Sequence, residues 1–267
     1  MTELTDPGRP GAAWPPPAPG AAPRPKVVAA QAGLELRTLV RNGEQLLLTL
    51  IIPVLLLVVF SAEALISVGH LRRIDFIAPG ILALAIMSTS FTSLAIGTGF
   101  ERRYGVLKRL GATPLGRSGL IAAKALTVLA VEAGQVVLIV ATSLLLGWRP
   151  VVSAASLSST LLLLILGSAA FSGLAMLMAG TLRAEATLAA ANLVYLVLLG
   201  IGGIVFPLAK FPPGLRPVLR LLPSGALSDG LRSALTYGAG LSARDALVLT
   251  AWAAVGIAAS ARWFRWE

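Results

Sequence analysis

The chain has 267 residues, of which 56% are hydrophobic and 13% are charged, and its 22 Lys and Arg residues against 12 acids give a net charge of +10. Soluble domains carry about 25% charged residues, and the apolar residues here fall in long blocks, so the composition excludes an ordinary soluble domain and indicates membrane spans. The absence of cysteine excludes disulfides and thiolate metal sites, and the single histidine, His70, argues against histidine catalysis within the membrane.

The positive charge gathers in segments beside the apolar blocks. This placement is typical of membrane proteins, whose cytoplasmic loops carry an excess of Lys and Arg and meet anionic lipid headgroups. We therefore attribute the positive charge to the orientation of the protein in the membrane and to contact with membrane lipid as a partner. We expect no nucleic-acid partner.

The N-terminal part divides into a tail and a helix. Residues 1–26 are rich in proline and cannot bury enough apolar surface to order themselves, so we predict a disordered cytoplasmic tail. Residues 27–45 mix an apolar face with Glu35, Arg37 and Arg41, which is too polar to span and predicts a helix lying in the membrane interface.

The remaining apolar blocks predict an all-α integral membrane protein with six transmembrane helices in one domain, residues 27–267. Each block is long enough to cross the ~30 Å of hydrocarbon in a bilayer. The predicted spans are about 46–66, 76–99, 119–147, 157–180, 187–206 and 243–262. The proline-rich loop at 207–242 predicts short broken helices on the membrane surface.

The orientation follows from the distribution of basic residues. If the N-terminus lies inside, fourteen Lys and Arg residues fall on the inner side of the six spans and eight on the outer side. The positive-inside bias then places both termini in the cytoplasm of a multi-pass cell-membrane protein. The loop between spans two and three also becomes cytoplasmic.

That loop contains the densest charge of the chain, in the stretch FERRYGVLKRLGATPLGR at residues 100–117. On a helical wheel, one face holds Tyr104, Val106, Leu107 and Leu110, and the other holds Glu101, Arg102, Lys108 and Arg109. Gly111 and Pro114 end the pattern. We predict a short amphipathic helix with its charged face outward. From composition alone, an anchor beside lipid headgroups is a simpler explanation of this helix than a docking site.

The order E-R-R-Y-G-V-L-K-R-L-G-A-T-P-L, followed by Lys124, resembles the cytoplasmic loop of ABC-2 type transporter permeases. The stretches ELRTLVRNGEQLLLTLIIPVLL, DFIAPGILAL and LLPSGALSDGLR are similar to three further parts of that family, in the same order. The similarity covers nearly all of residues 30–265, and it is strongest to the drug-resistance (daunorubicin-exporter-like) type of actinobacteria. The proline-rich tail departs from the family pattern.

The resemblance implies a coupling helix that sits in a cleft of an ATP-binding subunit. Its members would be Glu101, Gly105, Leu107, Leu110, Thr113 and Pro114, with Arg102, Lys108 and Arg109 pairing with acids of the partner. Gly105 would permit close approach of the partner's backbone. A Walker A motif, G-x-x-x-x-G-K-[ST], does not occur in the sequence, so ATP and magnesium would bind the partner and this chain would hold no cofactor.

The implied assembly is a dimer of permeases, identical or paralogous, with a dimer of ABC ATP-binding subunits. It would export a hydrophobic or amphipathic substrate, such as a drug, an antibiotic or a lipid-like molecule. The sequence also lacks the H-E-x-x-H and G-x-S-x-G motifs of membrane-embedded or hydrolytic enzymes. We therefore expect a transporter subunit and not an enzyme.

Four polar residues within predicted spans are candidates for a substrate path. Glu132 and Gln135 lie one turn apart in span three, and Asn192 and Tyr195 one turn apart in span five. A carboxylate at depth is costly, so Glu132 should face protein or a cavity; a hydrogen-bonded packing role, a substrate contact and proton coupling all remain open for it. An autonomous proton-coupled secondary transporter is the alternative function, but it would not explain the coupling-like loop.

Overall fold

The computed structural model describes residues 22–43, 47–62 and 72–266, and these residues form helices connected by turns, without strands. In chain order the elements are α1 (Arg24–Arg41), η1 (Leu47–Ile51), α3 (Ile52–Ala62), α4 (Arg73–Met87), η2 (Ser88–Ser93), α5 (Leu94–Arg103), α6 (Val106–Gly111), α7 (Gly116–Leu145), α8 (Ala154–Thr181), α9 (Ala184–Ile201), η3 (Leu208–Lys210), α10 (Arg216–Arg220), α11 (Pro223–Tyr237) and α12 (Ala243–Trp263). The predicted all-α class is confirmed.

Five of the described helices are long and apolar enough to cross a membrane. They are Arg73–Arg103, Gly116–Leu145, Ala154–Thr181, Ala184–Ile201 and Ala243–Trp263. The first predicted span appears as a shorter apolar helix, Thr49–Ser61, and both its predicted ends and the loop with His70 reach into segments outside the described residues. The fifth span ends earlier than predicted, because Gly203 adopts a left-handed φ of 72° just after α9.

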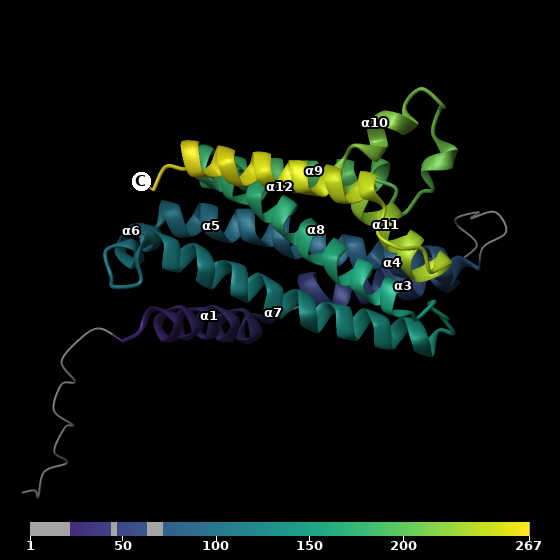
Figure 1. Cartoon of the computed structure of the whole chain (residues 1–267). Coiled ribbons are helices and arrows are strands. Elements are labelled where there is room, and N and C mark those ends of the chain that lie inside the picture. Colours follow the sequence, from purple (N-terminus) through teal and green to yellow (C-terminus); the bar gives the residue numbers. More distant parts are fainter. Residues whose placement is uncertain (1–21, 44–46, 63–71, 267) are drawn as a thin grey trace, which may run out of the picture.

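The continuous helix formed by α4, η2 and α5 is the centre of the bundle (Figure 1). Its apolar window is 89% buried within the chain, against 17–39% for the other four long helices. Small residues permit this central position. A Cβ atom at Gly80 would lie 2.4 Å from the backbone oxygen of Ile204, so only glycine allows the connection after α9 to pass so close.

Helices α8 and α12 pack side by side along one flank of the central helix (Figure 1). At their contact a Cβ atom on Gly173 would lie 2.9 Å from the backbone nitrogen of Ile257, and one on Gly256 would lie 2.9 Å from the backbone of Gly173. The two glycines therefore face each other. Such small-residue contacts let membrane helices approach closely and gain dispersion energy.

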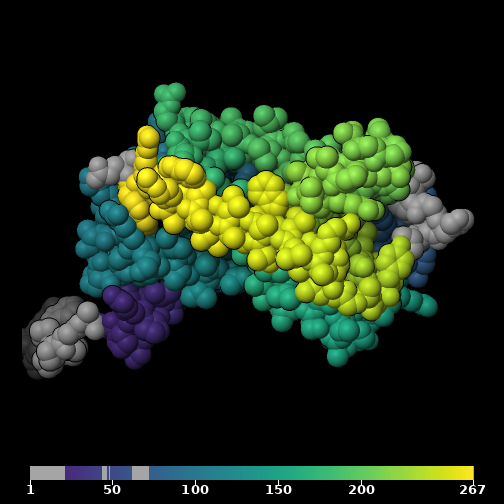
Figure 2. Space-filling model, turned by 45° about the horizontal axis from the view of Figure 1, so that its top comes forward, coloured from purple at the N-terminus to yellow at the C-terminus, as the bar shows by residue number. Residues whose placement is uncertain are grey.

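The prediction that the loop before the last span lies on the surface is wrong for α11. Leu227 and Leu231 are fully buried, and α11 packs against α4 and α8. Gly167 of α8 makes room for Leu227, since a Cβ atom there would lie 2.9 Å from the leucine methyl group. Short η3 and α10 form the projecting part of this loop at one end of the molecule (Figures 1 and 2).

Helix α1 lies alongside the N-terminal half of α7 (Figure 1). The hydroxyl of Thr127 donates a hydrogen bond to the Ala32 carbonyl at 3.3 Å, but none of the α1 side chains is fully buried. The predicted tail lies outside the described residues as far as residue 21, and its last residues already belong to α1, with Pro25 in the first turn, where proline is well tolerated.

Candidate coupling site

The predicted amphipathic helix is interrupted by a turn at Gly105, which separates α5 from α6. Gly105 has a φ of 67°, a conformation that side chains with a Cβ atom rarely adopt, and a Cβ atom there would meet nothing within 4 Å. The backbone angle therefore explains the glycine without any close contact inside the chain. Helix α6 then runs for six residues, and the Thr113 hydroxyl donates to the Leu110 carbonyl at 2.6 Å just after its end.

The apolar side of the coupling segment, defined as residues 100–117, faces this chain's own helices. Leu107 is 1% exposed and packs with Leu115 and Leu120 at the start of α7, with Leu110 partly buried beside them. Tyr104 departs from the predicted apolar face, since it is 64% exposed. The leucines therefore stabilise the position of α6 on α7.

The outer side of the coupling segment is basic. Its exposed residues are Arg103, Tyr104, Lys108, Arg109, Ala112, Thr113, Pro114 and Arg117. Arg109 donates to the backbone oxygens of Tyr104 at 3.1 Å and Gly105 at 3.4 Å, so this cation also secures the turn. We call these exposed residues the basic surface.

Arg102 and Arg103 of the segment have partners within the chain. Arg102 donates a hydrogen bond to the carbonyl oxygen of Leu182, and Arg103 forms an ion pair with Glu185 at the start of α9. Both contacts join the end of α5 to the connection between α8 and α9. They hold the coupling segment to a second pair of spans.

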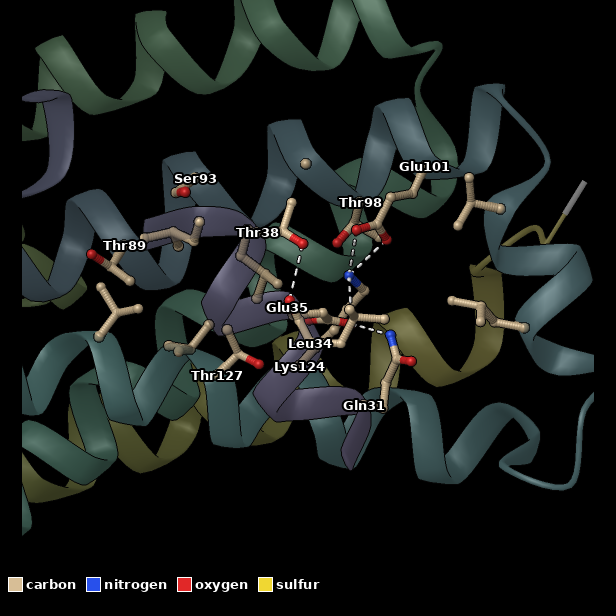
Figure 3. Close-up of a pocket in the computed structure, with 17 residues that line it drawn as sticks. Gln31, Leu34, Glu35, Thr38, Thr89, Ser93, Thr98, Glu101, Lys124 and Thr127 are labelled. Atoms are coloured by element: carbon tan, nitrogen blue, oxygen red, sulfur yellow. Dashed lines mark hydrogen bonds and ion pairs between the residues drawn. The ribbon is translucent and has the colours of Figure 1, made fainter. Parts of the chain in front are cut away.

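Glu101 also points inward, and it meets a lysine that the sequence analysis did not select as a site residue. The Lys124 Nζ atom lies 2.6 Å from Glu101 Oε2 and 3.7 Å from Glu35 Oε1 (Figure 3). The lysine side chain is 7% exposed. These three residues, the Lys124 cluster, tie α1, α5 and α7 together. A lysine inside a predicted span, five residues after its start, was the available signal, because such cations pair with carboxylates.

A pocket of about 400 Å³ lies next to the Lys124 cluster, between α1, α5, α6 and α7 (Figure 3). Its polar wall includes Thr38, Thr98 and Thr127, and Thr98 Oγ1 is buried without a hydrogen-bond partner among the described residues. The rest of the lining is mainly apolar. The pocket therefore separates parts of α1 and α6 that do not pack directly against one another.

Glu132 lies deep in α7, 4% exposed, beside the hydroxyl groups of Ser90 and Ser168 from two neighbouring helices. One carboxyl oxygen, Oε1, has no hydrogen-bond partner among the described residues. The expectation that this carboxyl faces protein is therefore correct. Its role in transport stays a prediction.

Gln135 links the two π-helical turns of the described chain. Its Nε2 atom donates to the Thr49 carbonyl of η1 at 2.6 Å, and its Oε1 atom accepts from the Thr89 hydroxyl of η2 at 2.9 Å. The side chain is fully buried. Gln135 thus fastens three membrane helices together, and π-helical turns of this kind often occur at functional positions.

The four candidate path residues do not gather in one cavity. Glu132 and Gln135 are buried in α7, whereas Asn192 is exposed on α9 and Tyr195 is partly buried there. A separate apolar groove of about 410 Å³ runs between α8, α9 and α12, and Phe91, Val194 and Trp252 are among its lining residues. The structure thus separates the polar candidates from the apolar groove.

Together, the long apolar helices packed around a central span define a polytopic membrane protein, with a basic surface at one end of the bundle. Residues 69–262 match the model of the ABC-2 family transporter proteins, and the chain belongs to this family. A search of curated proteins gave no match.

Family membership makes the chain an integral multi-pass membrane subunit of an ABC transporter, which works with a separate ATP-binding subunit. Subunits of this kind carry no ATPase activity and bind no cofactor of their own. The autonomous secondary transporter considered above is therefore set aside.

Proposed function

We propose that this chain is the permease subunit of an ABC exporter that moves a hydrophobic or amphipathic molecule out of the cell. The ATP-binding dimer would dock on the basic surface, and two permease copies, identical or paralogous, would form the path. A drug, an antibiotic or a lipid-like molecule is the expected substrate class, which rests on the sequence resemblance and is supported by the apolar groove between α8, α9 and α12.

The observation that carries the proposal is the way the coupling segment is fastened. Glu101, just before the Gly105 turn, is bound to Lys124 of α7, and Leu107, just after it, is buried against α7. A displacement of the coupling segment by a partner bound to the basic surface would therefore also displace α7 and, through the contact of Lys124 with Glu35, α1. Both termini and this end of the bundle would lie in the cytoplasm, as the basic residue count predicts.

The resemblance assigns Leu107 to the coupling helix, but this side chain is not available to the ATP-binding subunit. Because Leu107 is buried within the chain, a charged residue there would disturb α6 itself and would not report on docking. The exposed aromatic ring of Tyr104 and the cations around it are better placed to contact a partner. Rim charges mainly tune association, whereas a central aromatic side chain contributes more to affinity.

The test is co-purification of the ATP-binding subunit with membrane-expressed variants. Tyr104→Ala combined with Lys108→Glu should lower the retained ATPase about tenfold or more and abolish substrate-stimulated hydrolysis. Arg149→Glu, an exposed charge reversal beyond the opposite end of α7, is the matched control and should retain the ATPase. Full retention and normal hydrolysis in the double variant would exclude the basic surface as the docking site.

A further inference from the structure

The end of the bundle that carries α10 lies opposite to α6 (Figure 1). A second cavity is lined there by residues of η3 and α10, among others. It has a volume of about 770 Å³. Residues of α4, α11 and α12 and of the connection after α9 line it. We call it the cationic cavity, because its wall holds four basic and two acidic side chains. These are Lys210, Arg220, Arg232, Arg244, Asp229 and Asp245.

The charges of this cavity do not balance. Asp245 is paired with Arg244 at 2.7 Å, but Asp229 is the one remaining carboxylate for the other cations of the wall. Arg220 and Arg232 stand 3.9 Å and 3.7 Å from it, beyond hydrogen-bond distance. Lys210 has no ion-pair partner among the described residues. The cavity therefore carries a net charge of +2 with its cations incompletely paired.

Arg232 is held in place by groups other than an acid. Its guanidinium lies 3.8 Å from the ring centroid of Phe76 and donates to the carbonyl oxygens of Phe76 at 3.2 Å and Ile204 at 2.8 Å. Carbonyls and an aromatic face orient the cation but do not neutralise it. Burial also raises the pKa of Asp229.

The depth of the cavity matches the headgroup region of a membrane. Phe76 lies in the first turn of α4, and Arg244 in the first turn of α12, where these apolar helices begin. Tyr237, at the end of α11, lines the cavity and is 65% exposed. Tyrosine and basic side chains at span ends are typical contacts of lipid headgroups.

We propose that the cationic cavity binds the phosphate group of an anionic amphiphile, with an anionic phospholipid headgroup as its occupant. A phosphate oxygen accepts hydrogen bonds from Arg220 and Lys210, and the buried positive charge of Arg232 adds electrostatic attraction. The site does not use the basic surface and does not depend on ATP hydrolysis. Free phosphate offers the same chemistry, and the experiment separates the two sources.

The first arm measures lipid retained by the purified full chain from mixed micelles of phosphatidylglycerol and phosphatidylcholine with equal acyl chains. Each basic residue near an anionic surface contributes about 1 kcal/mol, which corresponds to a roughly fivefold change in binding. Phosphatidylglycerol enrichment should therefore fall about fivefold in Arg220→Gln and in Lys210→Gln. It should rise several-fold in Asp229→Asn, which removes the opposing carboxylate. Arg149→Gln, the matched exposed charge at the same end, should stay close to wild type.

The second arm titrates inorganic phosphate, with chloride at equal ionic strength, against thermal unfolding in a neutral detergent. Stabilisation by phosphate that follows the same order of variants, without any change in lipid retention, would identify the free anion as the source and uphold the phosphate site. Equal losses in Arg149→Gln and Arg220→Gln would reveal only diffuse surface charge and overturn the proposal. The absence of any difference between variants in both arms would also overturn it. Lys210 and Arg220 are exposed, so these variants should fold, as an unchanged unfolding temperature without anion would verify.

Discussion

Lys124 Nζ lies 2.6 Å from Glu101 Oε2 and 2.9 Å from Glu101 Oε1, so an ammonium group of α7 holds the last carboxylate before the coupling turn. The lysine is almost fully buried, whereas the Glu101 side chain remains about one-third exposed. A pair of this kind costs desolvation energy and becomes strongly unfavourable when one partner is removed. Its position between the coupling segment and the span makes it the most informative contact for mutation.

Lys124→Met should destabilise the chain by about 2–3 kcal/mol, because it leaves two carboxylates facing each other in a poorly hydrated site. Adding Glu101→Gln to Lys124→Met should recover part of this loss, since the pair is coupled. Thermal unfolding in detergent measures both changes. Arg183→Met, an exposed cation before α9, is the control and should be nearly neutral; purely additive effects would show that Lys124 and Glu101 do not interact.

Gly105→Ala should cost about 1–2 kcal/mol, because alanine is strained at a φ of 67° although space is available for its methyl group. Gly105→Asn should cost less, as asparagine tolerates the left-handed conformation. Gly97→Ala is the control within α5, where a Cβ atom also meets nothing but the backbone is helical. Unfolding temperature and ATPase retention should fall together in Gly105→Ala. Equal behaviour of the two alanine variants would contradict the strain argument.

Gln135→Leu should destabilise the bundle by roughly 1–2 kcal/mol, because it removes the hydrogen bonds to Thr49 and Thr89 within the membrane. Thr142→Val, on the same helix, removes only an exposed hydroxyl that bonds its own helix and should have little effect. Unfolding in detergent compares the two. If Gln135→Leu proves as stable as Thr142→Val, the three-helix link contributes nothing measurable.

Glu132 can be tested by separating its shape from its charge. Glu132→Gln keeps the hydrogen-bonding group beside Ser90 and Ser168, whereas Glu132→Leu removes it. If the carboxyl only packs, transport in reconstituted vesicles should survive in the glutamine variant and weaken in the leucine variant. Loss of transport in Glu132→Gln at normal expression would indicate an ionised role instead.

Topology is checked by accessibility reporters placed in exposed connections. A reporter after Ala112 should read cytoplasmic, and one after Gly240, in the turn between α11 and α12, should read external. A site within α11 would be unsuitable, because that helix is buried in the bundle. A cytoplasmic signal at Gly240 would contradict both the proposed orientation and the proposed position of the ATPase.

The sequence was sufficient for the helical class and for the approximate position of the long spans, because long apolar blocks leave the backbone no other way to satisfy its hydrogen bonds in lipid. It also indicated the family, since residues 69–262 retain the pattern of the ABC-2 transporters. The amphipathic character of residues 100–111 was likewise readable, as local periodicity does not depend on the rest of the fold.

Only the tertiary structure decided which faces of these elements are covered. A helical wheel separates Leu107 from Lys108, but it does not tell whether the leucine meets a partner or the chain's own α7. The burial of α11 and the pairing of Glu101 with Lys124 depend on contacts between segments distant in sequence. Hydrophobic pattern is a local property, whereas charge pairing and packing are set by the positions of neighbouring helices.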